Sequence, residues 1–277
     1  LLGPQEIRDL AAQLGIRPTK TLGQNFVIDP NTIRRIVAAA DITDDETVLE
    51  IGPGLGTLTA ILLRQAGRVV SVEFDAELAR KLPGQFPGTN LQVVAGDILQ
   101  YDTSQLPAGY KVVANVPYYI TSKIIQKCMT DTNRPSVVVL LTQKEVAERA
   151  AAQPGDMSVL AVSAQLYADV TLGIDVPAMY FTPPPKVDSR VLILHTKQPQ
   201  LPDGVSEKQF FRVVKAGFSA RRKKLRSSLS GGLAISKPQA EEILIRAGVS
   251  ANARAEDLSV AAWCRLAACV YQTLLAL

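Results

Sequence analysis

The chain has 277 residues, 47% of them hydrophobic and 20% charged, with a formal net charge of +4 at pH 7. These values are ordinary for a globular protein, so they argue against a disordered chain, and the length allows one large and one small domain. No apolar run approaches the roughly 20 residues needed to cross a bilayer, and the first residues lack the features of a secretory signal. We therefore expect a cytoplasmic protein with no membrane contact.

Cysteine and histidine usage argues against a metal site. Cys128, Cys264 and Cys269 show no metal-type spacing, and the chain has a single histidine, His195. Without histidine partners, the cysteines are expected to be buried thiols. His195 ends an apolar, strand-like run, which argues against a catalytic role.

Strand-like and helix-like patterns alternate along the first half of the chain. A helix is predicted over residues 4–14, an ordered loop or lid over 17–29, and a helix from Asp29-Pro30 to Ala40. The elements expected next are, in chain order, a strand at 47–51, a helix at 57–65, a strand at 68–73, a helix at 76–82, strands at 91–94 and 110–114, a helix at 122–129, a strand at 136–142 and a helix at 144–152. This rhythm predicts a mostly parallel sheet covered by helices on both faces, with ligands at the carboxyl ends of its strands.

The pattern changes after residue 152. Residues 170–176 and 190–195 look like two strands joined by a proline-rich segment, and they predict an antiparallel pair at the sheet edge. Pro199, Pro202 and Gly204 mark a linker, and beyond it the sequence looks wholly helical. We therefore predict an α/β domain over residues 1–199 and a small all-helical domain over 200–277.

Glycines and acids at strand ends indicate a nucleotide-like ligand. The run Glu50-Ile51-Gly52-Pro53-Gly54-Leu55-Gly56 joins the first sheet strand to its helix, where glycines let the backbone approach a ligand closely. Glu73 ends the second strand and could accept ribose hydroxyls, and Asp97 ends the third and could accept from an adenine amino group. Taken singly, Glu73 could be a helix cap and Asp97 a turn residue, but these alternatives explain their joint placement poorly. A nicotinamide dinucleotide loop would need Gly or Ala where this chain has Thr57, so S-adenosylmethionine is favoured.

The segment Asn115-Val116-Pro117-Tyr118 follows an apolar strand and suits chemistry on an exocyclic base amine. The lone pair of such an amine is delocalised into the ring, so the site must localise it. The Asn115 side-chain oxygen and a backbone carbonyl beside Pro117 could accept both amine protons, while the Tyr118 ring holds the base. A proton leaves readily once the nitrogen has become cationic, so no general base is required. The alternative is that Asn115 caps the next helix and Tyr118 packs in the core.

A basic run lies in the C-terminal part of the chain, with six basic residues and no acid between Lys215 and Arg226. A short basic run is commonly a solvated helix face. Beside a site for a base amine, contact with phosphates is the better explanation.

With these motifs assembled, the chain closely resembles the ribosomal RNA adenine N6,N6-dimethyltransferase family, in particular the bacterial small-subunit enzymes linked to kasugamycin sensitivity. The resemblance covers nearly the whole chain and is carried by four segments: residues 23–29, with Val27 where Leu is usual, 50–59, 115–118 and 181–189. It implies a Rossmann-like class I methyltransferase sheet and S-adenosyl-L-methionine as the cofactor.

The resemblance also implies roles for individual residues. The cofactor would be bound by Asn25, Val27, Gly52, Gly54, Glu73, Asp97, Ile98 and Asn115. Asn115 and Pro117 would orient the amine, and Tyr118 and Phe181 would stack on the target adenine, a contact worth about 1–3 kcal/mol. The alternative for Phe181 is a core aromatic beside a rigid proline loop. RNA would be bound by Arg221, Arg222, Lys223, Lys224 and Arg226.

Two segments, 221–229 and 254–259, look like the small-subunit branch and not like the related erythromycin-resistance enzymes, which act on large-subunit RNA. The small-subunit resemblance implies dimethylation of two neighbouring adenosines near the 3′ end of 16S rRNA, within an immature 30S subunit, and we expect a monomer. The segment after Gly155 is several residues shorter than in many relatives, which leaves the role of a loop there open.

Three alternatives stay open. One is a large-subunit enzyme of the erythromycin-resistance type. Another is a non-catalytic ribosome-assembly factor, against which the intact Asn115 and Tyr118 argue. The third is a nucleotide-dependent oxidoreductase, against which Thr57 and the lack of a proton-relay histidine argue.

Overall fold

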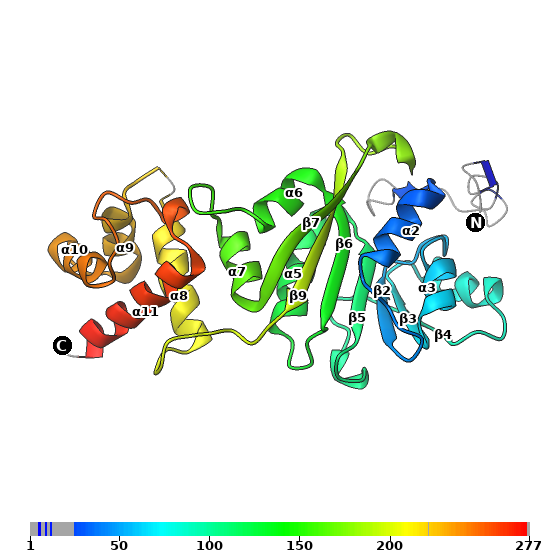
Figure 1. The fold of residues 1–277 in the computed structure, drawn as a ribbon, viewed down its shortest axis with the longest axis horizontal. Helices are drawn as coiled ribbons and strands as arrows, with labels where there is room; N and C mark the ends of the chain where they lie inside the picture. Colours follow the sequence, from blue (N-terminus) through cyan, green and yellow to red (C-terminus); the bar gives the residue numbers. More distant parts are fainter. Residues whose placement is uncertain (1–4, 7–8, 10–11, 13–24, 221, 276–277) are drawn as a thin grey trace. The chain divides into compact units, whose positions relative to one another are not determined.

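The computed structural model describes residues 5–6, 9, 12, 25–220 and 222–275, which form two compact units (Figure 1). The first unit holds the described residues up to Glu148 together with Ala168–Lys197, and the second holds Arg149–Tyr167 together with the described residues from Gln198 onward. Most of the helix predicted over 4–14, most of the lid predicted over 17–29, and Arg221 lie outside the described residues. The domain boundary predicted after residue 199 falls near the division between Lys197 and Gln198, but residues 149–167, which were predicted to lie in the first domain, belong to the second unit.

The first unit is built on a seven-stranded sheet with the strand order β4-β3-β2-β5-β6-β9-β7 (Figure 1). Its strands are β2 (Thr47–Ile51), β3 (Arg68–Glu73), β4 (Leu91–Ala95), β5 (Lys111–Asn115), β6 (Val137–Gln143), β7 (Ala168–Val176) and β9 (Ser189–Thr196). All pairs among β4, β3, β2, β5 and β6 are parallel, whereas β9 runs antiparallel to both of its neighbours, β6 and β7. The predicted parallel sheet with an antiparallel edge pair is confirmed.

Helices cover both faces of this sheet, which is why its central strands are continuous apolar runs. Val48 and Val113 pack in a core with residues of α2 and α3, whereas Leu49 lies on the opposite face near Ile124 of α5. The α-helices described in this unit are α2 (Pro30–Ala38), α3 (Thr59–Gln65), α4 (Ala76–Lys81), α5 (Thr121–Thr130) and α6 (Lys144–Ala150).

Acidic side chains cap two of these helices. Asp29 Oδ2 accepts hydrogen bonds from the Thr32 backbone N–H at 2.7 Å and the Thr32 hydroxyl at 2.6 Å, at the start of α2. Asp75 Oδ1 accepts the Glu77 N–H at 2.9 Å at the start of α4. Such caps satisfy N–H groups that have no partner within the helix. The predicted helix start at Asp29-Pro30 is therefore confirmed.

The strand order reverses between β2 and β5. β3 and β4 lie on one side of β2, while β5 and β6 lie on the other. Connections that leave β2 and β5 therefore run to opposite sides, and a crevice opens above the carboxyl ends of these two strands. Gly52 follows β2 at this edge, and Asn115 ends β5 there.

A second, two-stranded sheet joins the N-terminal segment to the proline-rich segment. β1 (Phe26–Val27) pairs antiparallel with β8 (Phe181–Thr182), so that Phe26 lies opposite Thr182 and Val27 opposite Phe181. The Ile28 N–H also donates to the Tyr180 carbonyl at 2.8 Å. Neither strand was predicted, because two residues are too few for a periodic signal.

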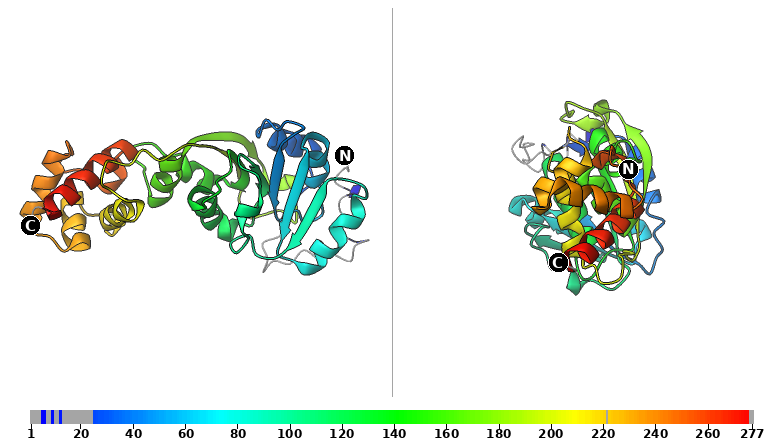
Figure 2. Two further views of the ribbon diagram at one scale, coloured as in Figure 1. Left: turned by 90° about the horizontal axis from the view of Figure 1, so that it is seen from below. Right: turned by 90° about the vertical axis from the view of Figure 1, so that its left-hand side faces the viewer.

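The regular elements described in the second unit are all helical. Its α-helices are α7 (Val159–Tyr167), α8 (Glu207–Phe218), α9 (Leu225–Leu233), α10 (Lys237–Arg246) and α11 (Val260–Leu275). Helices α8 to α11, drawn yellow to red, pack against one another (Figures 1 and 2). The predicted helical C-terminal region is confirmed, but α7 was missed because it is apolar around most of its circumference and shows no amphipathic period. Among the described residues, no helix has both the length and the apolar character that crossing a membrane requires.

Two glycines allow helices of the second unit to approach closely. Gly217 of α8 lies against the buried Trp263 ring of α11, and Gly232 of α9 lies against α8 at Ala216. A Cβ on Gly232 would come within 2.6 Å of Ala216 Cβ and 2.7 Å of its Cα, which is closer than carbon atoms can approach. The neighbouring Gly231 points into open space, with nothing within 4 Å of a Cβ placed there.

We predict opposite effects for the same substitution at these two neighbours. Gly232→Ala should lower the free energy of unfolding by about 1–3 kcal/mol, because α8 and α9 must move apart. Gly231→Ala should raise it by up to about 1 kcal/mol, because alanine favours the helix and meets no neighbour here. Urea unfolding followed by circular dichroism measures both values, and equal effects of the two substitutions would contradict the packing argument.

A buried carboxyl group lies beneath the glycine loop. Glu50 of β2 is fully shielded from solvent, and its Oε2 accepts hydrogen bonds from Thr59 Oγ1 and Ser71 Oγ, both at 2.7 Å. These bonds tie β2 to the start of α3 and to β3, the elements beside the loop. Glu50 Oε1 has no partner among the described residues. Burial is the main cause that raises the pKa of Glu50 to about 7; the Glu73 carboxylate adds to the rise, and the two hydroxyl bonds oppose it.

Glu50 should therefore make folding stability depend on pH. Between the ordinary carboxyl pKa of 4.5 and about 7, folded Glu50 holds a proton that the unfolded chain has released, so stability falls as the pH rises through this window. Glu50→Gln keeps an acceptor oxygen for the two hydroxyls and carries no charge. It should flatten the dependence and raise the free energy of unfolding near neutral-to-basic pH by on the order of 2 kcal/mol. Urea unfolding on either side of the window measures this, and parallel losses in the wild type and Glu50→Gln would show that the proton is not on Glu50.

Candidate active site

A cavity of about 330 Å³ opens at the carboxyl ends of the parallel strands, where the strand order reverses. Its size lies in the range of small-molecule sites, about 300–1,000 Å³. The residues predicted from sequence that line it are Asn25, Gly52, Gly54, Glu73, Asp97, Ile98, Asn115, Pro117 and Tyr118. The structure therefore gathers most of the predicted cofactor and catalytic residues around one cavity.

Two residues predicted for the site, Val27 and Phe181, lie elsewhere. They are 4% and 2% exposed and pack in the hydrophobic core, and neither lines the cavity. The strand register is the cause, because Val27 pairs with Phe181 across β1 and β8, so both side chains point to the same face. Phe26, the neighbour on β1, lines the cavity instead. This position agrees with the alternative interpretation of Phe181 as a core aromatic, and its stacking role stays a prediction.

The glycine loop passes close to an aromatic ring. Gly54 has a φ of 57°, in the left-handed region, and a Cβ there would come within 2.7 Å of the Phe26 ring. Glycine at this position therefore permits both the turn of the loop and the packing of Phe26 against it.

Glu73 holds the loop from the end of β3. Its Oε2 accepts the Gly54 N–H at 3.0 Å, and its Oε1 accepts the Asp75 N–H at 2.9 Å. Burial raises the pKa of Glu73, and the backbone bonds from Asp75 and Gly54 act against that rise. A carboxylate has about four acceptor positions, so two oxygens that each accept one N–H can also accept the vicinal hydroxyls of a ribose.

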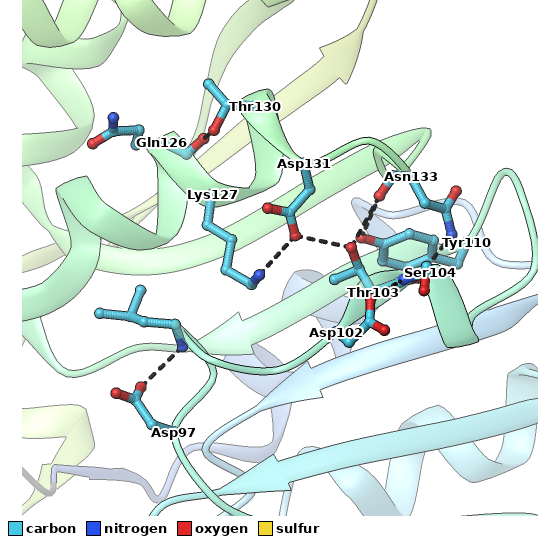
Figure 3. Close-up of polar contacts among 11 residues, drawn as sticks. Asp97, Asp102, Thr103, Ser104, Tyr110, Gln126, Lys127, Thr130, Asp131 and Asn133 are labelled. Carbon is cyan, nitrogen blue, oxygen red and sulfur yellow. Dashed lines mark hydrogen bonds and ion pairs between the residues drawn. The ribbon is translucent and has the colours of Figure 1, made fainter.

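Asp97 follows β4 and shapes the next turn. Its Oδ1 accepts the Leu99 N–H at 2.9 Å (Figure 3). This is the turn role that the sequence analysis considered as the alternative. Because Asp97 also lines the cavity, its carboxylate can serve both the turn and a ligand.

Asn115 is oriented by the segment before β1. Its Nδ2 donates to the Asn25 carbonyl at 2.8 Å, which fixes the plane of the amide and leaves Oδ1 to accept a hydrogen bond from a group in the cavity. The alternative role as a helix cap is not seen, because α5 starts at Thr121 with no side-chain cap.

Tyr118 is fixed by a bond to β9. Its hydroxyl lies 2.6 Å from Ser189 Oγ, and Ser189 is fully buried. Burial raises the pKa of Tyr118, and the bond to Ser189 only partly offsets this, so the phenol stays neutral. Tyr118 also lines the cavity, so the residue can contact a ligand there while its hydroxyl is held.

Sequence reasoning missed several lining residues, among them Phe26, Phe74, Tyr119 and Lys123. Phe74 and Tyr119 are 64% and 65% exposed, although both are large aromatic side chains. Phe74 directly follows Glu73, and Tyr119 directly follows Tyr118. An aromatic residue next to a predicted site residue was therefore the signal that could have found them.

A polar network fixes α5 beside the cavity. Asp131, at the end of α5, accepts hydrogen bonds at Oδ2 from Lys127 Nζ at 2.7 Å and from Thr103 Oγ1 at 2.8 Å (Figure 3). Asn133 Nδ2 donates to the carbonyls of Thr103 and Leu106, both at 2.9 Å. Because Thr103 and Leu106 belong to the connection between β4 and β5, this network ties α5 to the turn that carries Asp97.

The donor set of the cavity fits an adenosine-containing cofactor. Carboxylates, an amide and backbone N–H groups surround aromatic and aliphatic side chains, which suits a ribose and a purine. Within the described residues, no group of three or more His, Cys, Asp or Glu side chains could hold a metal ion. Cys128 is buried, as expected, whereas Cys264 and Cys269 are only partly so.

The basic segment 222–226 lies at the start of α9 in the second unit. Lys224 Nζ donates to Asn252 Oδ1 at 2.6 Å, and Arg226 forms an ion pair with Glu241 at 2.6 Å. Arg222 and Lys223 are exposed and form no ion pair with another described residue. Part of the predicted RNA-binding set thus has structural partners, while Arg222 and Lys223 present their charges to solvent.

A family model described as ribosomal RNA adenine dimethylase matches residues 16–272 of the chain. The ribosomal RNA small subunit methyltransferase A of Thermobifida fusca (strain YX) is 43% identical over 275 residues, which cover 96% of this chain and 95% of that protein. The protein of the same name from Dehalococcoides mccartyi (strain CBDB1) is 40% identical over 255 residues, covering 91% of this chain and 88% of that protein.

Two solved structures share the fold over most of the chain. The 23S rRNA methyltransferase ErmE is 30% identical with a TM-score of 0.71, covering 89% of this chain and all of that chain. A dimethyladenosine transferase from Plasmodium falciparum is 26% identical with a TM-score of 0.73, covering 86% of this chain and 94% of that chain. The family model spans far more than half of the chain, and the relatives are similar over nearly their full lengths. The chain therefore belongs to the ribosomal RNA adenine dimethylase family.

Proposed function

We propose that this chain transfers methyl groups from S-adenosyl-L-methionine to N6 of two adjacent adenosines near the 3′ end of 16S rRNA. The substrate would be an immature 30S subunit in the cytoplasm, and the enzyme would act as a monomer. The observation that carries the proposal is that Asn115, oriented by Asn25, shares one cavity with Glu73 and Asp97. The names of the relatives from Thermobifida fusca and Dehalococcoides mccartyi support the choice of small-subunit RNA.

The residues at the strand ends would hold the cofactor. When bound, S-adenosylmethionine supplies a methyl group activated by its sulfonium. Glu73 would accept the ribose hydroxyls, and Asp97 would accept the adenine amino group. Gly52 and Gly54 would let the cofactor lie close to the backbone above β2.

The Asn115–Tyr118 segment would hold the target base. Asn115 Oδ1 and a neighbouring backbone carbonyl would accept the amine protons and direct the nitrogen lone pair toward the methyl group, while the Tyr118 ring supports the base. The bound cofactor would supply the methyl group as its C–S bond broke and the C–N bond formed, and the proton of the cationic nitrogen would pass to water. The contribution of the protein is thus positioning. A second transfer needs a site that accepts an amine with one remaining proton, so we expect some spare room beside Asn115.

The second unit would bind the RNA backbone. Arg222, Lys223 and Lys224 present positive charge at the start of α9, and Arg226 and Arg221 would add to it. Contacts between cationic side chains and phosphates release counterions, so binding should weaken steeply with added salt.

A labelling experiment separates the remaining alternatives. The protein is incubated with radiolabelled S-adenosylmethionine and either small subunits that lack the modification or unmodified large subunits, and labelled nucleosides are mapped. Dimethyladenosine near the 3′ end of 16S rRNA supports the proposal. Label only in large subunits would indicate an enzyme that acts like ErmE, which at 30% identity is a more distant relative. Subunit binding without any label would indicate an assembly factor.

Replacement of Asn115 tests the catalytic assignment. Asn115→Ala removes the acceptor that localises the lone pair, and it should lower kcat by about two to three orders of magnitude, by analogy with the loss of one oriented hydrogen-bonding group in other active sites. Asn31→Ala is a matched control, because Asn31 is exposed on α2 and its side chain accepts a hydrogen bond from Arg34, the one side-chain partner it has among the described residues. Thermal unfolding checks that both variants fold. Wild-type turnover by Asn115→Ala would remove the proposed mechanism.

Charge reversal tests the RNA-binding assignment. Arg222→Glu combined with Lys223→Glu should weaken small-subunit binding and reduce its salt dependence, while binding of S-adenosylmethionine stays at the wild-type level. Arg64→Glu combined with Arg80→Glu makes the same change in total charge at exposed positions of α3 and α4. Filter binding at several salt concentrations measures the subunit affinity. Equal losses in the two double variants would mean that net charge, and not this segment, governs binding.

A further inference from the structure

Tyr119 is an aromatic side chain that the fold leaves in solvent at the mouth of the cavity. It is 65% exposed and lines the cavity together with Asn115 and Tyr118. Exposed aromatic surface next to a binding cavity is commonly a contact surface for a partner. The functions assigned above to Asn115, Tyr118, Glu73 and Asp97 do not use Tyr119.

The local backbone explains why two adjacent tyrosines have different environments. Residues Tyr118–Ile120 form a turn of 3₁₀ helix, in which successive side chains point about 120° apart. Tyr118 therefore points inward, where its hydroxyl meets Ser189, while Tyr119 points outward to solvent. A base held against Tyr118 and a base held against Tyr119 would consequently be neighbours.

Lys123 places a positive charge beside Tyr119. It is exposed in the first turn of α5 and lines the same cavity. Among the described residues, it forms no ion pair. The network of Lys127, Asp131 and Thr103 anchors the other end of α5, so the helix presents Lys123 from a fixed element (Figure 3).

The charges around the cavity indicate which ligand these two residues receive. Three acids line the cavity: Glu73 ends β3, Asp75 lies two residues beyond it and Asp97 follows β4. Tyr119 and Lys123 instead follow β5. A phosphate near the acids would be repelled, and a phosphate near Lys123 would be attracted. Of the two substrates proposed above, only RNA carries phosphates, so RNA is the substrate that Lys123 would attract through such a group.

We propose that Tyr119 and Lys123 form a subsite for the nucleotide next to the target adenosine, with its base on the Tyr119 ring and its phosphate beside Lys123. This inference rests on the proposed function. It adds a reason why two adjacent adenosines are substrates: while one occupies the cavity, its neighbour is held in register on Tyr119, and a shift of one nucleotide exchanges the two.

Kinetics with small subunits that lack the modification test this subsite. Tyr119→Ala should raise the KM for subunits by roughly 5- to 150-fold, the range that corresponds to the loss of one base–aromatic stack. Tyr119→Phe should retain a KM close to the wild-type value, because the ring is kept. Lys123→Ala should raise the KM and reduce the slope of log affinity against log salt by about 0.7, as expected for one lost phosphate contact to a single strand. Lys123→Arg should restore both.

Isothermal titration with S-adenosylmethionine provides the control for each variant. The Kd for the cofactor should stay unchanged in Tyr119→Ala and Lys123→Ala. Phe74 is the other exposed aromatic residue among the described residues that line the cavity, and it lies on the β3 side. Phe74→Ala should weaken cofactor binding without the rise in subunit KM.

Several outcomes would overturn the inference. If Tyr119→Ala raised the cofactor Kd as much as the subunit KM, the residue would belong to the cofactor site. If the subunit KM were unchanged in Tyr119→Ala and Lys123→Ala, and the wild-type protein methylated both adenosines, the subsite would be contradicted and the proposed function would still hold. A wild-type protein that methylates neither adenosine would remove both together.

Discussion

The site depends on the reversal of strand order between β2 and β5. Connections that leave these adjacent strands run to opposite sides of the sheet, so neither can fill the space above their carboxyl ends. The same edge brings Glu73, Asp97 and Asn115 around one cavity, although long stretches of chain separate them. The Glu50 carboxyl group joins the elements of this edge, because its hydrogen bonds connect β2 to β3 and to the start of α3 beside the glycine loop. Sheet topology, rather than any local motif, therefore creates the chemical environment.

Orientation within the cavity comes from segments remote in sequence. The bond between Asn115 and Asn25 spans 90 residues, and the bond between Tyr118 and Ser189 spans 71. The small sheet of β1 and β8 links these two supports, because Asn25 directly precedes β1 and the chain runs from β8 to Ser189 at the start of β9. A serine hydroxyl and a backbone carbonyl do not change charge at physiological pH, and burial keeps the Tyr118 phenol neutral. The contacts that hold Asn115 and Tyr118 therefore carry no charge that changes near physiological pH.

Hydrophobic periodicity predicted the sheet and most of its helices, because long buried strands and capped helices leave a strong pattern. Glu73 and Asp97 were predictable for the same reason, since the end of a strand fixes where its last side chain lies. That the Val27 and Phe181 side chains do not line the cavity could not be predicted, because the faces of a two-residue strand are set by its partner, and pairing between β1 and β8 leaves no trace in either segment alone. Tyr119 was missed because its direction depends on a 3₁₀ turn, where a residue and its neighbour face opposite environments. What sequence could not supply was therefore the direction of side chains in short elements.

The charges that line the cavity favour different positions for the cofactor and the RNA. The cavity is lined by three carboxylates, and RNA phosphates would be repelled by them. Glu73, Asp75 and Asp97 lie at the ends of β3 and β4, and Lys123 lies beyond β5. Repulsion on one side and attraction on the other would bring the RNA strand in over β5, so that the target base enters past Tyr118 and Asn115. The acids proposed to bind the cofactor would then also keep the RNA strand from entering over β3 and β4. The distribution of charge at the strand ends would thus place the cofactor on the β3 side of the cavity and the target base on the β5 side.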